Sequence, residues 1–270
     1  MILYKYVGRE GMKAIIRGGS FLVRPIDDYN DPFEGLPAFD DKGVQFVIEN
    51  VLLQPRALGR LANDEDILGG RYSKAQTRLL LKNGPTREMI IRKLRERSKL
   101  TFLEMAQSFQ KHFAGSYGLV CLTEDPRNLL MWSHYAEEHK GYVLAVDFSS
   151  WKSTSIMKVN YSDERVVFSS SEPTETELRA MFSTKSKAWE YEQEYRILCK
   201  EDNWRVKNGR QVGFLKLSPM QIPWICAGVK AAESEIEEVM SCLRGSLFDG
   251  ARLLRAEIDE RRFSVDIAGL

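Results

Sequence analysis

The sequence predicts an α+β protein built on a single mixed, mostly antiparallel sheet with peripheral helices and a basic helical insertion. Short apolar runs of strand length dominate its second half, beginning at residues 118–122. Apolar residues recur at helical spacing over 44–53 and 86–112, with a polar, glycine-containing stretch between them. No internal repeat or linker divides the chain, so we expect one domain over residues 1–270 with the insertion at about 44–115.

The individual elements follow from local patterns. Apolar runs bounded by polar or glycine residues predict strands over 1–6, 21–26, 118–122, 141–148, 156–161, 195–199, 212–217 and 223–229, with one or two more within 253–266. Outside the insertion, helices are predicted over 8–17, 128–137 and 234–243. The first helix should end at Gly18 and Gly19, because glycine readily adopts the left-handed conformation that closes a helix.

The composition is that of an ordinary globular protein. Hydrophobic residues make up 43% of the chain and charged residues 29%, which argues against global disorder. No apolar run approaches the ~20 residues needed to span a bilayer. Residues 1–6 lack the basic segment and long apolar stretch of a secretion signal. We therefore expect a cytoplasmic protein with no membrane partner, and the sequence leaves its oligomeric state open.

Cysteine and histidine spacing gives no support to a metal site. The cysteines are far apart and are expected to be free thiols: Cys121, Cys199, Cys226 and Cys242. No zinc-type spacing occurs among them. His134 and His139 are five residues apart, which misses the spacing of four that places two ligands on one helical face. No metal is expected.

Positive charge is concentrated in the insertion. The whole chain has a net charge of +1, but Arg56 to Lys99 contains twelve Lys or Arg against five Asp or Glu, a local excess of +7 that leaves about −6 elsewhere. This excess indicates either the solvated face of helices or a surface that binds phosphates of RNA, DNA or a dinucleotide. The candidate nucleic-acid-binding residues are Arg92, Lys93, Arg95 and Arg97.

The first polar motif is Asn30-Asp31-Pro32-Phe33-Glu34. Proline fixes its own φ and favours extended geometry at Asp31, so the neighbouring side chains are held in defined directions. Asn30, Asp31 and Glu34 can therefore line a pocket beside Phe33. The alternative is an Asx-type turn in which Phe33 fills the core.

The second motif is Met131-Trp132-Ser133-His134-Tyr135-Ala136. In a helix, Trp132 and Tyr135 share a face while His134 points elsewhere. An aromatic face can stack on a flat, cationic ring, although aromatics at helical spacing are more often core residues. His134 can act as an acid or base near pH 7.

The third motif runs from Lys185 to Arg196 and leads into an apolar strand. If the strand begins near Tyr191, its period of two places Glu192, Glu194 and Arg196 on one face. Charged residues that enter a buried strand need partners. Either Glu194 and Arg196 form a structural ion pair, or Glu194 is a catalytic carboxylate oriented by Arg196.

The succession of these motifs resembles an uncharacterised bacterial family, domain-of-unknown-function family 2971. The resemblance spans residues from about 3 to 230. It rests on the segments Leu3-Tyr4-Lys5-Tyr6, Asn30–Glu34, Met131–Tyr135, His139-Lys140-Gly141 and Trp189–Arg196. The family's function is poorly defined, so the resemblance selects residues more than it indicates a reaction.

A second resemblance is to the ADP-ribosyltransferase fold, in particular its DNA-modifying branch. It implies a first site position at Tyr4, Lys5 and Tyr6, a central aromatic at Trp132 or Tyr135, and a late carboxylate at Glu194. Lys5 stands where that superfamily usually has His or Arg, and a clear Ser-Thr-Ser motif is missing.

The chemistry that this second resemblance implies is cleavage of the nicotinamide–ribose bond of NAD. Such cleavage passes through an oxocarbenium-like state that a carboxylate stabilises. The implied catalytic residues are Glu194, Arg196 and His134. The implied residues around NAD, which is a substrate here, are Tyr4, Lys5, Tyr6, Asn30, Asp31, Glu34, Trp132 and Tyr135.

Three classes of function therefore stay open. The first is an NAD-consuming, ADP-ribosyltransferase-like enzyme that modifies nucleic acid as a toxin or phage-defence effector. The second is a protein that binds or cleaves nucleic acid through the basic insertion. The third is a regulatory interaction protein without catalysis, in which the motifs are structural.

Overall fold

The computed structural model describes residues 1–55, 57–96, 98–114, 116–152, 155–168, 173–200, 205–207 and 210–268. The fold is α+β with one large, curled, mostly antiparallel sheet, which confirms the predicted fold class. The chain forms two compact units. The first contains Met1–Pro25, Tyr117–Tyr161 and Lys185–Leu270, and the second contains Ile26–Ser116 and Ser162–Thr184. A single domain with an insertion at about 44–115 stays a prediction.

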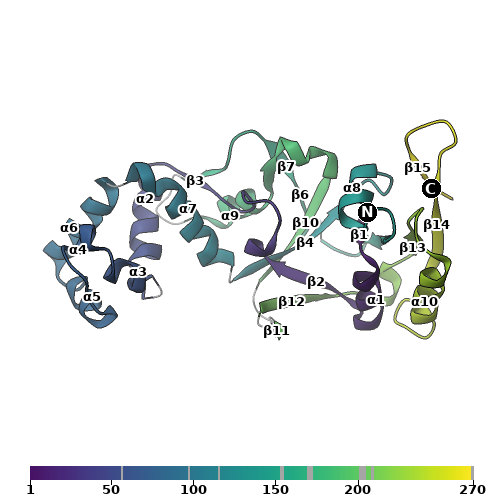
Figure 1. The fold of residues 1–270 in the computed structure, drawn as a ribbon, viewed down its shortest axis with the longest axis horizontal. Coiled ribbons are helices and arrows are strands. Elements are labelled where there is room, and N and C mark those ends of the chain that lie inside the picture. The colour runs from purple at the N-terminus through teal and green to yellow at the C-terminus, as the bar shows by residue number, and fades with distance from the viewer. Residues whose placement is uncertain are drawn as a thin grey trace. The chain divides into compact units, whose positions relative to one another are not determined.

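The first unit is built on the large sheet (Figure 1). Its strands lie in the order β11-β12-β2-β4-β1-β5-β13-β14-β15, and β10 pairs with both β4 and β6. Among the described residues of this sheet, β13 and β14 pair in parallel and the other strand pairs are antiparallel. The strand bounds are β1 Ile2–Val7, β2 Ser20–Pro25, β4 Tyr117–Thr123, β5 Tyr142–Asp147, β6 Met157–Lys158, β10 Glu194–Lys200, β11 Arg205–Lys207, β12 Arg210–Lys216, β13 Trp224–Ala227, β14 Arg252–Ile258 and β15 Val265–Ile267.

Both faces of this sheet are buried at β5. Alternate residues of β5 belong to two different apolar clusters, and one cluster also contains residues of helices α1 (Arg9–Gly18) and α10 (Glu233–Leu243). The other cluster contains the helix α8 (Leu129–Tyr135), with the Trp132 ring at its centre. Burial on both faces explains why β5 is apolar from Tyr142 to Val146 rather than alternating. Gly19 closes α1 at φ 57°, as expected.

Strand β4 lies at a fork in the sheet. One edge of β4 pairs with β10 along its whole length. The other edge pairs with β2 at Leu119 and with β1 at Thr123, so β1 and β2 diverge between these two points. The Lys5 ammonium group lies there and donates a hydrogen bond to the carbonyl oxygen of Cys121 at 2.9 Å. Lys5 therefore supplies a donor where the paired strands separate.

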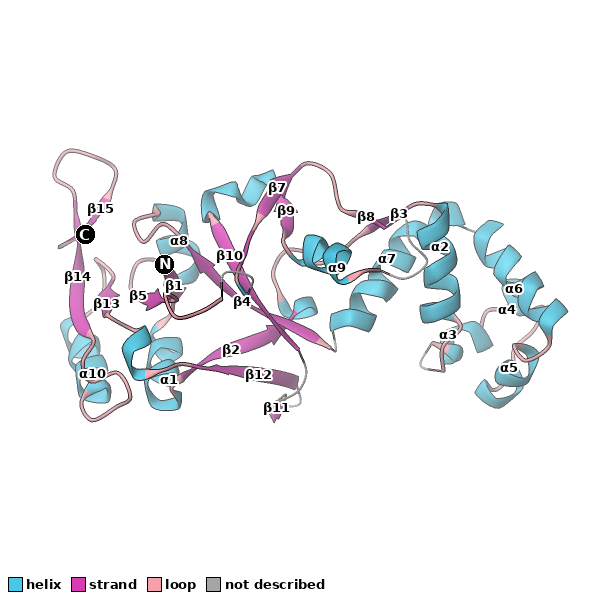
Figure 2. Cartoon of the chain, turned by 180° about the vertical axis from the view of Figure 1, so that it is seen from behind, coloured by secondary structure: helices cyan, strands magenta, loops and turns pink. Residues whose placement is uncertain are grey.

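The second unit is mainly helical (Figure 2). Its helices are α2 Asp41–Val47, α3 Leu58–Ala62, α4 Glu65–Leu68, α5 Lys74–Leu80, α6 Gly84–Glu96, α7 Ser98–Ala114 and α9 Glu175–Phe182, with a 3₁₀ turn at Ile26–Asp28 and a π-helical turn at Ile48–Leu52. The short strands β3 (Ala38–Phe39) and β8 (Val167–Phe168) pair in parallel. The short strands β7 and β9 span Asn160–Ser162 and Thr184–Ser186. The helical spacing of the sequence thus corresponds to observed helices.

The turn after α8 has an unusual backbone. Glu137, Glu138 and His139 all have positive φ, at 47°, 56° and 71°. Each non-glycine residue in this left-handed region costs of order 1 kcal/mol or more. The turn is held by backbone hydrogen bonds, including one from Lys230 to the His139 carbonyl oxygen at 3.0 Å. Contacts from outside the turn therefore offset its strain.

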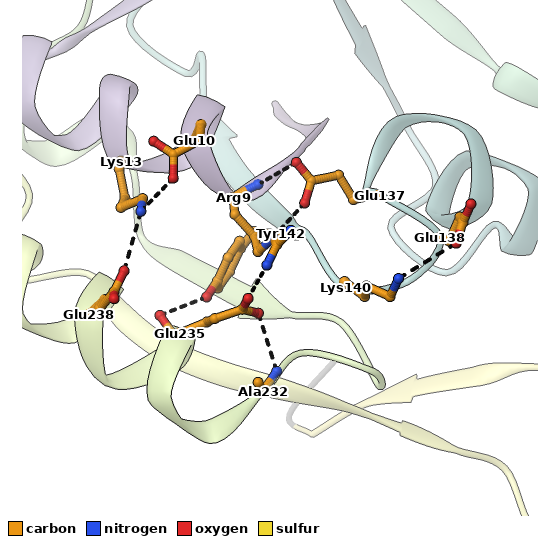
Figure 3. A network of polar contacts seen from close by, with 10 residues as sticks. All are labelled: Arg9, Glu10, Lys13, Glu137, Glu138, Lys140, Tyr142, Ala232, Glu235 and Glu238. Atoms are coloured by element: carbon orange, nitrogen blue, oxygen red, sulfur yellow. Dashed lines mark hydrogen bonds and ion pairs between the residues drawn. The ribbon is translucent and has the colours of Figure 1, made fainter.

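Charged side chains also hold this turn, as Figure 3 shows. The Glu137 carboxylate accepts hydrogen bonds from the Arg9 backbone N–H at 3.2 Å and from Arg9 Nε at 2.7 Å. It thereby caps the first turn of α1, whose own N-cap residue is Gly8 and offers no side chain. The Arg9 guanidinium also pairs with Glu235 in the first turn of α10. Arg9 thus links two helix N-termini to the strained turn.

We predict that Gly228→Ala destabilises the first unit. A Cβ at Gly228 would lie 2.1 Å from the His139 carbonyl oxygen, so the backbone of the strained turn must move. The expected loss is about 1–3 kcal/mol, measured by chemical or thermal unfolding. Gly250→Ala is the matched control, because a Cβ there meets nothing within 4 Å. Equal stability of the two variants would contradict this account of the turn.

Candidate functional site

The third motif begins with a 3₁₀ helix rather than a strand. Lys187–Glu192 forms this helix, Gln193 adopts a left-handed conformation at φ 44°, and β10 begins at Glu194. The strand predicted over 195–199 is therefore observed, but it does not begin as early as Tyr191, the start on which a shared face of Glu192, Glu194 and Arg196 depended. The Ser186 hydroxyl accepts a hydrogen bond from the Ala188 N–H, which favours a helical turn over an extended start.

Four charged side chains form a buried network at the start of β10. Arg196 is 0% exposed and donates from Nε to Glu194 Oε1 at 3.0 Å and from Nη2 to Oε2 at 2.9 Å. Lys185 Nζ donates to Glu194 Oε2 at 3.2 Å and to Glu192 Oε2 at 2.5 Å. Two positive and two negative charges therefore balance, and we call these four residues the buried charge network.

The charge network strongly favours the ionised form of Glu194. Burial alone would raise the pKa of this carboxyl, but the charges of Arg196 and Lys185 and its hydrogen bonds outweigh burial and lower the pKa to about 2. Burial likewise tends to lower the pKa of Lys185, and the two carboxylates reverse this and raise it above its ordinary value. The charged forms of Glu194 and Lys185 therefore stabilise each other.

The second motif contacts the third. The Tyr135 hydroxyl donates a hydrogen bond to Glu192 Oε1 at 2.6 Å. The Nδ1 atom of His134, which is exposed, lies 3.2 Å from the Tyr191 hydroxyl. Asn128 caps α8 with its side-chain oxygen and donates from Nδ2 to the Tyr191 carbonyl oxygen at 2.7 Å. The surface residues around His134 are thus joined to the buried charge network.

The tyrosines of β1 lie in or against the apolar cluster that contains Trp132. The Tyr6 ring meets the Trp132 ring edge-on at 5.3 Å, and both side chains are buried. Tyr4, Tyr135 and Tyr191 are only partly buried at the margin of this cluster, and we call them the tyrosine group. Lys5 points to the opposite face of β1 by strand alternation, where burial lowers the pKa of its ammonium group.

The first motif lies in the second unit and forms a turn. Asp31 Oδ1 accepts a hydrogen bond from the Phe33 N–H at 2.9 Å, which is the Asx-type turn considered as the alternative. Phe33 is 58% exposed, so it does not fill the core. Asp31 and Glu34 are buried, and Asn30 is exposed. A cleft that joins Asn30 and Glu34 to the other two motifs stays a prediction.

The candidate basic residues take part in contacts within the second unit. Arg92 pairs with Glu96 at 3.9 Å, and Arg95 donates to the Gln45 side chain. Lys93 Nζ donates to the carbonyl oxygens of Asp66 and Ile67 at 3.2 Å each, near the end of α4. Arg97 lies outside the described residues. Whether these residues bind nucleic acid stays a prediction.

Sequence reasoning did not select four residues of the site. Glu192, Lys185 and Tyr191 were within the third motif, but their contacts depend on the 3₁₀ helix that the strand interpretation missed. Asn128 could have been found, because an asparagine just before a helical apolar pattern is a good N-cap.

No group of three or more His, Cys, Asp or Glu in the described part of the chain is arranged to hold a metal ion. No helix among the described residues combines the length and apolar character needed to cross a membrane. The four cysteines are free thiols.

These features define an α+β protein with a forked, mostly antiparallel sheet and a balanced buried charge network beside the tyrosine group. A model of the family described as protein of unknown function (DUF2971) matches residues 131–197. This match to part of the chain confirms the first resemblance over those residues. The resemblance to the ADP-ribosyltransferase fold gains no support from the comparisons. No curated protein and no solved structure matches the chain.

We predict that Glu194→Gln destabilises the protein and alters its acid sensitivity. The substitution leaves Arg196 and Lys185 with too little negative charge, and breaking a buried pair typically costs about 3–5 kcal/mol. Because the pKa of Glu194 falls from about 4.3 in the unfolded chain to about 2 when folded, its contribution is present above pH ~4 and is lost as the pH falls towards 2. The free energy of unfolding of the variant should therefore lack the decrease that Glu194 causes as the pH falls from ~4 towards 2.

The measurement is unfolding by denaturant at several pH values. Glu190→Gln is the control, since Glu190 is an exposed carboxylate of the same segment. If Glu194→Gln unfolds like Glu190→Gln at neutral pH, the network does not stabilise the fold.

Proposed function

We propose that the protein is an NAD-consuming enzyme of the ADP-ribosyltransferase type, with the tyrosine group as part of its substrate site. The main support is that β1, the second motif and the third motif, which are far apart in the sequence, contribute aromatic residues to one cluster of the first unit. Tyr4 and Tyr6 of β1, the aromatic residues of α8, and Tyr191 belong to one cluster. The family match at residues 131–197 includes the second and third motifs, and with them Tyr135 and Tyr191 of the tyrosine group.

The chemistry of the exposed groups suits this substrate. The oxidised nicotinamide ring of NAD is flat and positively charged, and such rings bind well to tyrosine faces. His134 is exposed beside Tyr191, and an imidazole can exchange a proton near neutral pH. Transfer of ADP-ribose to nucleic acid would give the effector role expected of a toxin or phage-defence protein.

The burial of the charge network changes the roles that we propose. Glu194 is 3% exposed and both of its oxygens are bound by cations, so it is poorly placed to contact a substrate. We assign Glu194 and Arg196 as positioning residues. Through Lys185 they fix Glu192, which orients the Tyr135 hydroxyl at the surface. A direct catalytic role for Glu194 stays an untested prediction.

We predict that the wild-type protein releases nicotinamide from NAD and that His134→Gln slows this release. Loss of a general acid or base lowers a rate on the order of a hundredfold or more. Nicotinamide release by chromatography, with and without added DNA or RNA, is the measurement. The exposed position of His134 means that the variant should melt at the wild-type temperature.

Tyr195→Phe is the control variant, because Tyr195 packs against the other cluster and its hydroxyl binds Glu124. It should keep the wild-type rate. Wild-type protein that leaves NAD intact under all conditions would refute the proposal, and the motifs would then be structural, as in a regulatory interaction protein. Equal turnover by His134→Gln would remove His134 from the site.

A further inference from the structure

The helices α5 and α6 of the second unit are strongly basic. From Arg71 to Arg95 the sequence contains eight Lys or Arg and one acidic residue, Glu88, which gives a local excess of +7. Like charges at this density repel one another and cost stability. Binding of an anionic partner would relieve this repulsion.

Several of these cations already have partners within the unit. Arg71 pairs with Glu65 at 2.5 Å, and the contacts of Arg92, Lys93 and Arg95 are described above. Lys93 donates hydrogen bonds to carbonyl oxygens near the C-terminal end of α4, where positive charge is favoured. These residues therefore hold the small helices together.

Three other cations have no such role. Lys74, Arg78 and Lys82 are exposed, and among the described residues their side chains form no ion pair or hydrogen bond. Their spacing of four residues places them along one side of α5, about 6 Å apart along the helix axis. Leu81, at the end of the helix, keeps helical geometry, so Lys82 continues the row. We call this row the α5 stripe.

The residues around the stripe indicate the class of anion. Proteins that bind single strands stack bases on exposed aromatic side chains, whereas Tyr72 is the one aromatic residue from 71 to 95 and is only partly exposed. A helix that binds a membrane surface presents a broad apolar face, and Leu79 is the one exposed large hydrophobic residue in this range. The surface therefore presents positive charge without a stacking group or a broad apolar face. Such a surface suits the regularly spaced phosphates of a duplex.

We propose that the α5 stripe binds double-stranded nucleic acid through its phosphates, without reading the base sequence. This inference is independent of NAD turnover, since it concerns only the second unit. The residues proposed to contact nucleic acid are therefore Lys74, Arg78 and Lys82 rather than Arg92, Lys93 and Arg95.

The test compares a triple variant, Lys74→Gln with Arg78→Gln and Lys82→Gln, with the wild-type full chain. Binding to a mixed-sequence DNA duplex is measured by fluorescence anisotropy over a range of salt concentrations. We expect the variant to lose affinity on the order of tenfold or more. The slope of log affinity against log salt should decrease by about 0.9 for each lost phosphate contact.

A matched control removes three exposed positive charges from the first unit, with Lys216→Gln, Arg244→Gln and Arg252→Gln. It has the same net charge as the stripe variant and should keep wild-type affinity. Thermal melting of both variants shows whether they are folded, and NAD turnover of the stripe variant should not change. Equal binding by the stripe variant and the wild type would overturn the proposal.

Two further probes separate the alternatives. A single strand of the same sequence should bind more weakly than the duplex, and vesicles that contain phosphatidylserine should bind more weakly still. Tighter binding of either probe, or no binding of duplex by the wild type, would overturn the assignment to double-stranded nucleic acid.

Discussion

The ion pairing of Arg196 and Lys185 with two buried carboxylates is the interaction on which the first unit depends. Arg196 enters the sheet with no exposed surface, and a charge in that position is tolerated only when it is neutralised by close partners. The partner carboxylates come from the end of a 3₁₀ helix and the start of a strand. The geometry of that junction is therefore set by electrostatics as much as by apolar packing.

This requirement connects the interior to the surface. Glu192 has one oxygen on Lys185 and the other on the Tyr135 hydroxyl, so a helix on one face of the sheet is tied to charges buried beside β10. Asn128 adds a second tie, from the start of α8 to the backbone of Tyr191. The partly exposed tyrosines are thus held by polar contacts behind them, and such support gives a surface site a defined shape.

The sequence was informative where a structure is decided by local patterns. Apolar runs gave the strands, and Gly19 gave the end of α1, because periodicity and left-handed glycine act over a few residues. The pairing of Glu194 with Arg196 was anticipated as one alternative, since the residues are two apart on a strand. Lys185 and the fork at β4 could not be derived, because they depend on which strands become neighbours and on a helical turn that resembles a strand in sequence.

The cap that Glu137 provides for α1 has a consequence for how the chain acquires its structure during synthesis. The first helix obtains its N-terminal cap from a residue 128 positions later, and β1 lies between β4 and β5, which are also made much later. Residues 1–25 therefore leave the ribosome before the strands and the capping residue that flank them in the folded unit. Their apolar side chains stay exposed until about half of the chain has been synthesised. Folding of the first unit is consequently dominated by long-range contacts, which form slowly and leave apolar strands open to association in the meantime.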